Sequence, residues 1–261
     1  MNVIILAAGK GERLRPLTQT QPKCLVKLFG KSLLDWQIET FQNIGINDIT
    51  VITGYKSESI QLSNIKKITN NRFESTNMLE TLFCGQNELK DQTIVSYGDI
   101  IFEERVLKKL VDSKHEISII TDEKWHDLWK LRFDNPLNDA ESLKINEDSD
   151  IIDIGQPVSN ISDIQGQFIG LMKFQNNGVT NLKKYYKKAK ELSKNNINPL
   201  NSNVNFENSY MTDILNYLIT EGCKLKAIKI QNGWLELDSF NDYELYHNLY
   251  ERKNLKNLFS F

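Results

Sequence analysis

The sequence contains few of the residues that usually carry metal or disulfide chemistry. Its 261 residues include three cysteines, Cys24, Cys84 and Cys223, an odd number without the spacing of a metal site. This pattern predicts reduced thiols in a cytoplasmic protein. The three histidines have no recognisable partner in the sequence, and we expect all of them to be structural.

Long apolar runs and a large net charge are also missing. No apolar run is long enough to span a bilayer, and the chain enters a core strand at once, which leaves no room for a signal peptide. The formal net charge of -2 gives no bulk attraction to nucleic acid or to a membrane surface. We therefore expect a cytoplasmic protein that captures its ligands at a local site.

Two common nucleotide-binding signatures are absent. No G-x-x-x-x-G-K-[ST] sequence occurs, which excludes a P-loop protein. The pair Gly9-x-Gly11 lacks the third glycine of a dinucleotide-binding turn, because position 14 is Leu14.

The strongest pattern lies in the first 25 residues, MNVIILAAGKGERLRPLTQTQPKCL. Residues 3–6 are an apolar run that predicts a buried strand, and a turn of small residues, 7–11, follows it. Small residues let backbone N–H groups approach an anion closely, and Arg13, Arg15 and Lys23 would neutralise a polyphosphate. The segment therefore predicts a phosphate-binding loop at the end of the first strand.

The segment LAAGKGERLRPLT, followed by QPKCLV, closely resembles the signature of the sugar-phosphate nucleotidyltransferases. These enzymes make NDP-activated compounds from an NTP and a phosphorylated acceptor. Later segments resemble the cytidylyltransferase branch of phosphocholine type, and the resemblance is weakest around residues 56–72 and 175–208. It implies that the chain binds CTP or another NTP, Mg²⁺ and a phosphorylated acceptor. The loop residues expected at the nucleotide are Leu6, Ala7, Ala8, Gly9, Lys10, Gly11 and Arg13.

The rest of the chain predicts a single α/β domain over residues 1–261. Apolar segments at 49–53, 65–69 and 93–97 alternate with helical patterns, of which the first, 33–44, begins after Ser32 and ends at Gly45. This alternation indicates a Rossmann-like, mostly parallel sheet with helices on both faces. Ligands of such sheets bind at the carboxyl ends of the strands. The turn of residues 7–11, the opening loop, emerges at that edge.

Three carboxylates are candidates for holding Mg²⁺. Asp99 follows the strand at 93–97, and Gly98 gives access to it. In the segment WLELD, Glu236 and Asp238 share one face of an extended chain and match a W-x-E-x-D element of the resembled family. A turn role for Asp99 and surface positions for the other two are the alternatives. We also expect Gly98 to contact the nucleotide and Glu236 to contact the acceptor.

The segment STNMLETL resembles a T-N-x-x-x-S/T-L element that lies beside the nucleotide base in the resembled cytidylyltransferases. By that resemblance Thr76, Asn77 and Thr81 contact the base or ribose. The alternative is that Asn77 only caps a helix, although one residue can do both.

Residues 124–174 predict a small, β-rich, lid-like insertion that closes over the acceptor. The segment resembles a W-x-x-x-W…R-x-x-x-P-L-x-D-A-E stretch of phosphocholine-type enzymes. This resemblance implies that Trp125 and Trp129 line the acceptor pocket, while Lys130 and Arg132 hold the acceptor phosphate. The alternatives are tryptophans packed against the domain and two exposed charges.

The expected chemistry is metal-assisted nucleotidyl transfer with Arg13, Lys23 and Asp99 as catalytic residues. Lys23 contacts the substrate and stabilises charge growing on the α-phosphate. Uridylyl or thymidylyl transfer to a sugar 1-phosphate, and a non-catalytic nucleotide sensor, are the alternatives. The acceptor is open among phosphocholine, an aminophosphonate, a phosphorylated amino acid or amide, and a sugar phosphate. A C-terminal helix over about 239–258 suggests docking or a homodimer contact.

Overall fold

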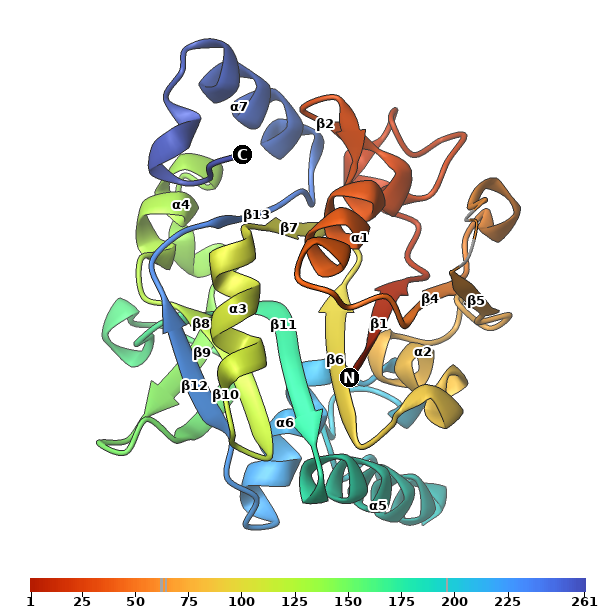
Figure 1. Cartoon of the computed structure of the whole chain (residues 1–261). Helices are drawn as coiled ribbons and strands as arrows, with labels where there is room; N and C mark the ends of the chain where they lie inside the picture. Colours follow the sequence, from red (N-terminus) through yellow and green to blue (C-terminus); the bar gives the residue numbers. More distant parts are fainter. Residues whose placement is uncertain (62, 64, 196) are drawn as a thin grey trace.

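A central β-sheet organises the chain (Figure 1). The computed structural model describes residues 1–61, 63, 65–195 and 197–261, and within them seven strands form this sheet in the order β12-β8-β11-β6-β1-β4-β5. Neighbouring strands are parallel except where β11 runs antiparallel to β6 and β8. The strands are β1 (Asn2–Ala7), β4 (Ile49–Thr53), β5 (Lys66–Thr69), β6 (Gln92–Tyr97), β8 (Ile117–Asp122), β11 (Gln167–Gln175) and β12 (Lys226–Ile230).

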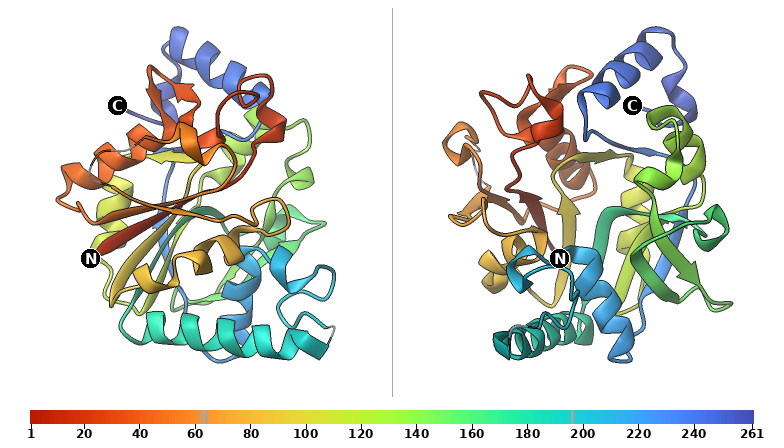
Figure 2. Two further views of the ribbon diagram at one scale, coloured as in Figure 1. Left: turned by 90° about the vertical axis from the view of Figure 1, so that its right-hand side faces the viewer. Right: turned by 180° about the vertical axis from the view of Figure 1, so that it is seen from behind.

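Helices cover both faces of the sheet, as the alternating pattern predicted. One hydrophobic cluster joins α1, α3, α4 and α7 to one face, and a second joins α2, α5 and α6 to the other. Figure 2 shows this layering, with α1 and α5 on opposite sides of the sheet. The helices are α1 (Leu33–Asn43), α2 (Met78–Cys84), α3 (Glu104–Asp112), α4 (Trp125–Arg132), α5 (Asn177–Leu192), α6 (Met211–Thr220) and α7 (Phe240–Glu251).

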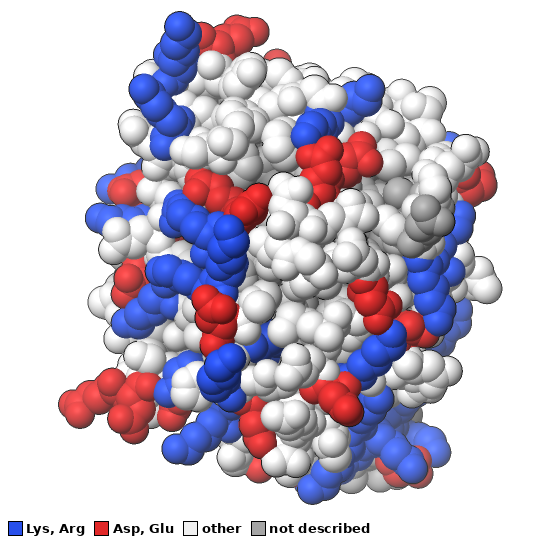
Figure 3. Space-filling model, viewed as in Figure 1, with Lys and Arg blue, Asp and Glu red and all other residues white. Residues whose placement is uncertain are grey.

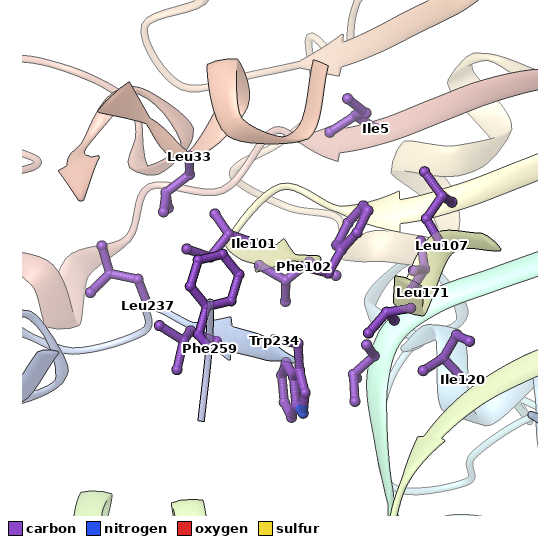
Figure 4. Close-up of a cluster of buried hydrophobic side chains, with 14 of the residues drawn as sticks. Ile5, Leu33, Ile101, Phe102, Leu107, Ile120, Leu171, Trp234, Leu237 and Phe259 are labelled. Carbon is purple, nitrogen blue, oxygen red and sulfur yellow. The ribbon is translucent and has the colours of Figure 1, made fainter. Parts of the chain in front are cut away.

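Strand β1 is apolar along its length because both of its faces are covered. Val3 and Ile5 belong to the cluster under α1 and α3, whereas Ile4 and Leu6 belong to the cluster on the other face. Figure 4 shows part of the first cluster, with Ile5 at its edge and side chains from other strands and helices below it. This burial on both faces anchors the strand from which the opening loop emerges.

Within the described residues, three small antiparallel sheets accompany the main one. They pair β2 (Lys27–Leu28) with β3 (Lys31–Ser32), β7 (Ile100–Phe102) with β13 (Trp234–Glu236), and β9 (Glu141–Ile145) with β10 (Ile151–Pro157). The segment 124–174 thus comprises helix α4, the β9–β10 hairpin and strand β11. Because β11 belongs to the main sheet, the part of this segment outside the sheet ends before residue 167.

The C-terminal helix is shorter than the range 239–258 expected from the sequence. Helix α7 ends at Glu251, and Lys253 has a φ of +59°, a conformation that ends a helix. Tyr246 is fully buried, whereas Tyr250 is exposed and contacts Phe29 and Phe261. One side of α7 is therefore docked on the domain, and a role in a homodimer stays a prediction.

Side chains of both charges are mixed on the surface of the molecule. Lysine and arginine alternate with aspartate and glutamate over the face shown in Figure 3. Within the described ranges, none of the helices has the length and apolar character that crossing a bilayer requires.

A buried glutamine ties α1 to the turn after β6. Gln37 Nε2 donates hydrogen bonds to the carbonyls of Tyr97 at 2.9 Å and Ile100 at 2.8 Å. Its Oε1 accepts a hydrogen bond from Ser96 Oγ at 2.7 Å. This side chain therefore fixes the turn that contains Gly98 and Asp99.

We predict that Gln37→Met destabilises the protein by about 1–3 kcal/mol, because it removes the partner of three buried polar groups. Urea unfolding followed by circular dichroism measures the change. The control is Gln42→Met on the exposed side of the same helix, for which we expect a change within about 0.5 kcal/mol. Equal effects of the two substitutions would contradict the role given to Gln37.

Candidate active site

The opening loop is shaped so that Lys23 approaches its backbone. Gly11 has a φ of +64°, and a Cβ at this position would lie 2.9 Å from Lys23 Cβ. The Gly11 carbonyl accepts a hydrogen bond from Thr18 Oγ1 at 2.7 Å, which closes the loop. Glycine is needed here for its backbone conformation and for its lack of a side chain.

Lys23 lies between two aspartates at the carboxyl end of the sheet. Its Nζ is 2.8 Å from Asp99 Oδ2 and 2.7 Å from Asp238 Oδ1. The other oxygen of Asp238 is 2.6 Å from Arg13 Nη2. The side chains of Lys23, Asp99 and Asp238 are 13–14% exposed, whereas that of Arg13 is 68% exposed. The four groups form a charge-balanced cluster with Arg13 on its outer side.

The directions of the pKa shifts of Lys23 and Asp238 favour the charged form of each side chain. Burial alone would lower the pKa of Lys23, but the charges of Asp99 and Asp238 hold it above its usual range. Burial alone would raise the pKa of Asp238, but the charge and hydrogen bond of Lys23 hold it below its usual range. An ammonium and a carboxylate that stabilise each other in this way keep a polar site charged within the fold.

Two neighbouring turns bring the aspartates together. Asp99 follows β6 through Gly98, where a Cβ would lie 2.6 Å from the Leu6 carbonyl oxygen. Strand β7 begins directly after Asp99, and Asp238 follows β13. These two strands pair with each other (Figure 1). The Leu237 N–H donates a hydrogen bond of 2.9 Å to the Asp99 carbonyl, so that the two turns are joined.

Asp99 and Asp238 fit the donor set of a divalent cation that also binds phosphate. Asp99 Oδ1 is buried and has no hydrogen-bond partner among the described residues. Hard cations such as Mg²⁺ are commonly held by one or two carboxylates together with phosphate oxygens. Across the described ranges no group of three or more His, Cys, Asp or Glu side chains could hold a metal ion. Asp99 and Asp238 are the two carboxylates that would hold such a cation.

Glu236, the third carboxylate expected at the metal, is paired with a buried arginine. Its Oε2 is 2.8 Å from Arg132 Nη1. Burial raises the pKa of Glu236, and Arg132 opposes this shift. A role for Glu236 as a metal ligand stays a prediction.

A cavity of about 400 Å³ opens from the opening loop to the start of α2. Asn77 is the residue that caps α2, and Thr81 Oγ1 accepts a hydrogen bond from Asn70. Lys10 is paired with Glu74 beside this cavity. The sequence-predicted residues on its wall are Leu6, Ala7, Ala8, Gly9, Gly11, Arg13, Lys23, Thr76, Asn77, Thr81, Gly98, Asp99 and Asp238.

A second cavity, of about 210 Å³, shares Arg13 and Met78 with the first. Burial raises the pKa of Asp139 above its usual range, and the charge of Arg132 partly opposes this shift. The acidic and aromatic side chains on its wall are Asp139, Glu141, Glu236, Tyr97, Phe168, Trp129, Tyr210 and Trp234. In the sequence, Asp139 and Glu141 stand out only as part of the resembled stretch, because spacing does not show that they share a cavity wall with Glu236.

The cations and tryptophans expected at the acceptor lie in different surroundings. Trp129 is on the wall of the second cavity, while Trp125 is 3% exposed and packs within the core. Lys130 is exposed on α4. The Arg132 side chain is 1% exposed and is paired with Glu236 and Asp242, so its charge is already compensated.

We predict that Lys23→Met creates a metal-binding site in the absence of nucleotide, because two facing carboxylates then lack a cation. Titration with Mn²⁺ by isothermal calorimetry measures this gain. Wild-type protein and the control Lys27→Met, which removes an exposed lysine nearby, should bind no Mn²⁺ in the same range. Equal binding by the three proteins would contradict the position given to Lys23.

Comparison with known proteins relates this geometry to a family. Residues 3–143 match the MobA-like NTP transferase domain. CTP:phosphoglutamine cytidylyltransferase of Campylobacter jejuni is 38% identical over 257 residues, covering 94% of this chain and 98% of that enzyme. Choline-phosphate cytidylyltransferase of Streptococcus pneumoniae is 33% identical over 119 residues, covering 44% of this chain and 52% of that enzyme.

Solved structures show the same fold. A structure of CTP:phosphocholine cytidylyltransferase from Streptococcus pneumoniae has a TM-score of 0.70 at 22% identity and covers 95% of this chain and 98% of its own. The inositol-1-phosphate CTP transferase from T. maritima has a TM-score of 0.69 at 19% identity and covers 100% of this chain and 98% of its own. The chain therefore belongs to the MobA-like NTP transferase family and is a nucleotidyltransferase.

Proposed function

We propose that the chain is a Mg²⁺-dependent cytidylyltransferase whose acceptor carries both a phosphate and a positively charged nitrogen. It joins CMP from CTP to the acceptor phosphate and releases pyrophosphate. The observation that carries this proposal is the second cavity, where carboxylates and aromatic rings lie beside the cluster of Lys23, Asp99 and Asp238. Carboxylates and aromatic faces are the groups that bind ammonium ions in proteins.

The substrates named for the relatives support an acceptor of this kind. Phosphoglutamine carries an α-amino group, and choline phosphate carries a quaternary ammonium. Both are small, and both combine one phosphate with one positively charged nitrogen. In this chain a cationic ligand would also favour the ionised form of Asp139, whose pKa burial has raised.

The first cavity binds CTP. The backbone of the opening loop and the exposed Arg13 face the phosphates, and Thr76, Asn77 and Thr81 face the base or ribose. Asp99 and Asp238 would hold Mg²⁺, which would supply positive charge between two phosphates that repel each other. Lys23, which bridges the two aspartates, would place its charge near the α-phosphate.

The second cavity holds the acceptor so that its phosphate lies at the junction of the two cavities, near Arg13. An oxygen of this phosphate attacks the α-phosphorus of CTP, and the bond from that phosphorus to the bridging oxygen of pyrophosphate breaks. A phosphate dianion is already a nucleophile at neutral pH, so no general base is required. Trp129 Nε1, which is buried and has no partner among the described residues, is a hydrogen-bond donor for an acceptor oxygen.

Pyrophosphate release with Mg²⁺ tests the proposal, with CTP, UTP, dTTP and ATP crossed against phosphorylated acceptors. The acceptors include phosphocholine with its uncharged analogue 3,3-dimethylbutyl phosphate, and phosphoglutamine with its analogue lacking the α-amino group. We expect turnover with CTP and with the charged member of one pair. Turnover with UTP or dTTP and a hexose 1-phosphate would contradict the base and the acceptor but keep the chemistry. Nucleotide binding without turnover of any acceptor would favour a sensor.

We predict that Asp139→Asn raises the KM of the cationic acceptor roughly 10- to 100-fold and changes kcat much less. The reason is that it removes one charged partner of the nitrogen, worth about 1.5–3 kcal/mol, from ground state and transition state alike. Steady-state kinetics at saturating CTP measures the effect. The control is Asp134→Asn, an exposed aspartate nearby. An unchanged KM in the Asp139 variant would remove Asp139 from the acceptor site.

We predict that Asp99→Asn lowers kcat by orders of magnitude while the fold is kept, because it removes a metal ligand and no packing group. Pyrophosphate release measures kcat, and far-UV circular dichroism confirms the fold. Activity near that of the wild type would mean that Asp99 is not a ligand.

A further inference from the structure

A buried ion-pair network joins α4, β13 and α7 next to the cluster of Lys23, Asp99 and Asp238. Arg132, the last residue of α4, has a side chain that is 1% exposed. Its Nη1 is 2.8 Å from Glu236 Oε2, its Nε is 2.9 Å from Asp242 Oδ1 and its Nη2 is 3.2 Å from Asp242 Oδ2. The guanidinium also lies 5.1 Å from the ring centroids of Trp129 and Phe133. One arginine therefore holds two carboxylates from different elements.

The carboxylate of Asp242, which Arg132 binds, also holds the backbone at Asp238 through hydrogen bonds. Asp242 Oδ2 accepts hydrogen bonds from the N–H groups of Asp238 at 3.1 Å and Ser239 at 2.8 Å. Ser239 Oγ in turn accepts a hydrogen bond from the Asp242 N–H at 3.2 Å, which completes the cap of α7. The carboxylate that Arg132 grips is therefore the one that fixes the turn containing Asp238.

Glu236 is held from both ends. Arg132 binds its carboxylate, and Tyr246 Oη donates a hydrogen bond of 2.9 Å to its backbone carbonyl. Since Leu237 is also bonded to the Asp99 carbonyl, the segment 236–239 has little freedom to move. Its position sets the separation between Asp238 and Asp99.

Stability alone does not account for such a network. Removing an arginine and an aspartate from water has a high desolvation cost, and apolar side chains of the same volume often give equal or greater stability. The network does give a fixed geometry, because the planar guanidinium binds Asp242 through two nitrogens.

We propose that Arg132 is a positioning residue for the metal site, acting through Asp242 on Asp238. This inference rests on the proposed function, because it assumes that Asp238 is a metal ligand. Arg132 touches neither the nucleotide nor the ion. It holds the backbone that aims the Asp238 carboxylate toward Asp99, and it fixes Glu236 on the wall of the acceptor cavity.

The test is Mn²⁺ binding to the full chain in the presence of a CTP analogue with a methylene group between its α- and β-phosphates. Isothermal calorimetry compares wild type, Arg132→Met and Arg132→Lys, and circular dichroism confirms the fold. We expect Arg132→Met to weaken Mn²⁺ binding roughly 10- to 100-fold, the range seen when an outer partner of a metal ligand is lost. Arg132→Lys should restore part of the affinity, because lysine keeps the charge but not the two-nitrogen contact.

The matched control is Arg252→Met, which removes an exposed arginine just beyond α7 and should leave Mn²⁺ affinity unchanged. If Arg132→Met does not fold, Asp242→Asn decides, because it keeps an oxygen for the helix cap but loses the charge that holds Arg132. A folded variant that binds Mn²⁺ as wild type does would overturn the inference and leave the proposed function intact. A wild-type chain that binds no Mn²⁺ with the analogue would overturn the metal site and this inference together.

Discussion

The candidate site depends on a lysine that neutralises two largely buried carboxylates. These carboxylates, Asp99 and Asp238, lie at the same end of the paired strands β7 and β13. Asp99 and Asp238 lie close together and are 14% exposed, an arrangement that is unfavourable without a cation between them. Lys23 supplies that cation in the structure described here. We propose the same position for a divalent ion once phosphates are bound, so that the pair of carboxylates held by Lys23 is also the proposed metal site.

The fold builds this site from parts that are distant in the sequence. Strand β1 anchors the opening loop, Gln37 fixes the turn after β6, and the pairing of β7 with β13 brings residue 238 beside residue 99. The second cavity, which we propose for the acceptor, forms where α4, β11 and β13 meet. Arg132 joins α4 to β13 and α7. Segments α4 and β13 therefore carry both the wall of the second cavity and these structural contacts.

Much of the fold could be predicted from the sequence, because strands that are apolar on both faces must be covered on both faces. The alternation of such strands with helices predicted the mostly parallel sheet, and the loop signature predicted the family. The surroundings of Arg132 could not be predicted, since Glu236 and Asp242 lie 104 and 110 residues away. For the same reason Asp139 gave no signal of its own. Spacing shows which residues share a strand face, but it does not show which distant elements meet.

The most direct test of the central claim is a crystal structure of the full chain with Mn²⁺ and a CTP analogue that cannot be cleaved. Anomalous scattering locates the ion independently of the protein coordinates. We predict an anomalous peak between the carboxylates of Asp99 and Asp238, with Lys23 Nζ moved from them to a phosphate oxygen. An ion bound elsewhere, with Lys23 still bridging the two aspartates, would contradict it.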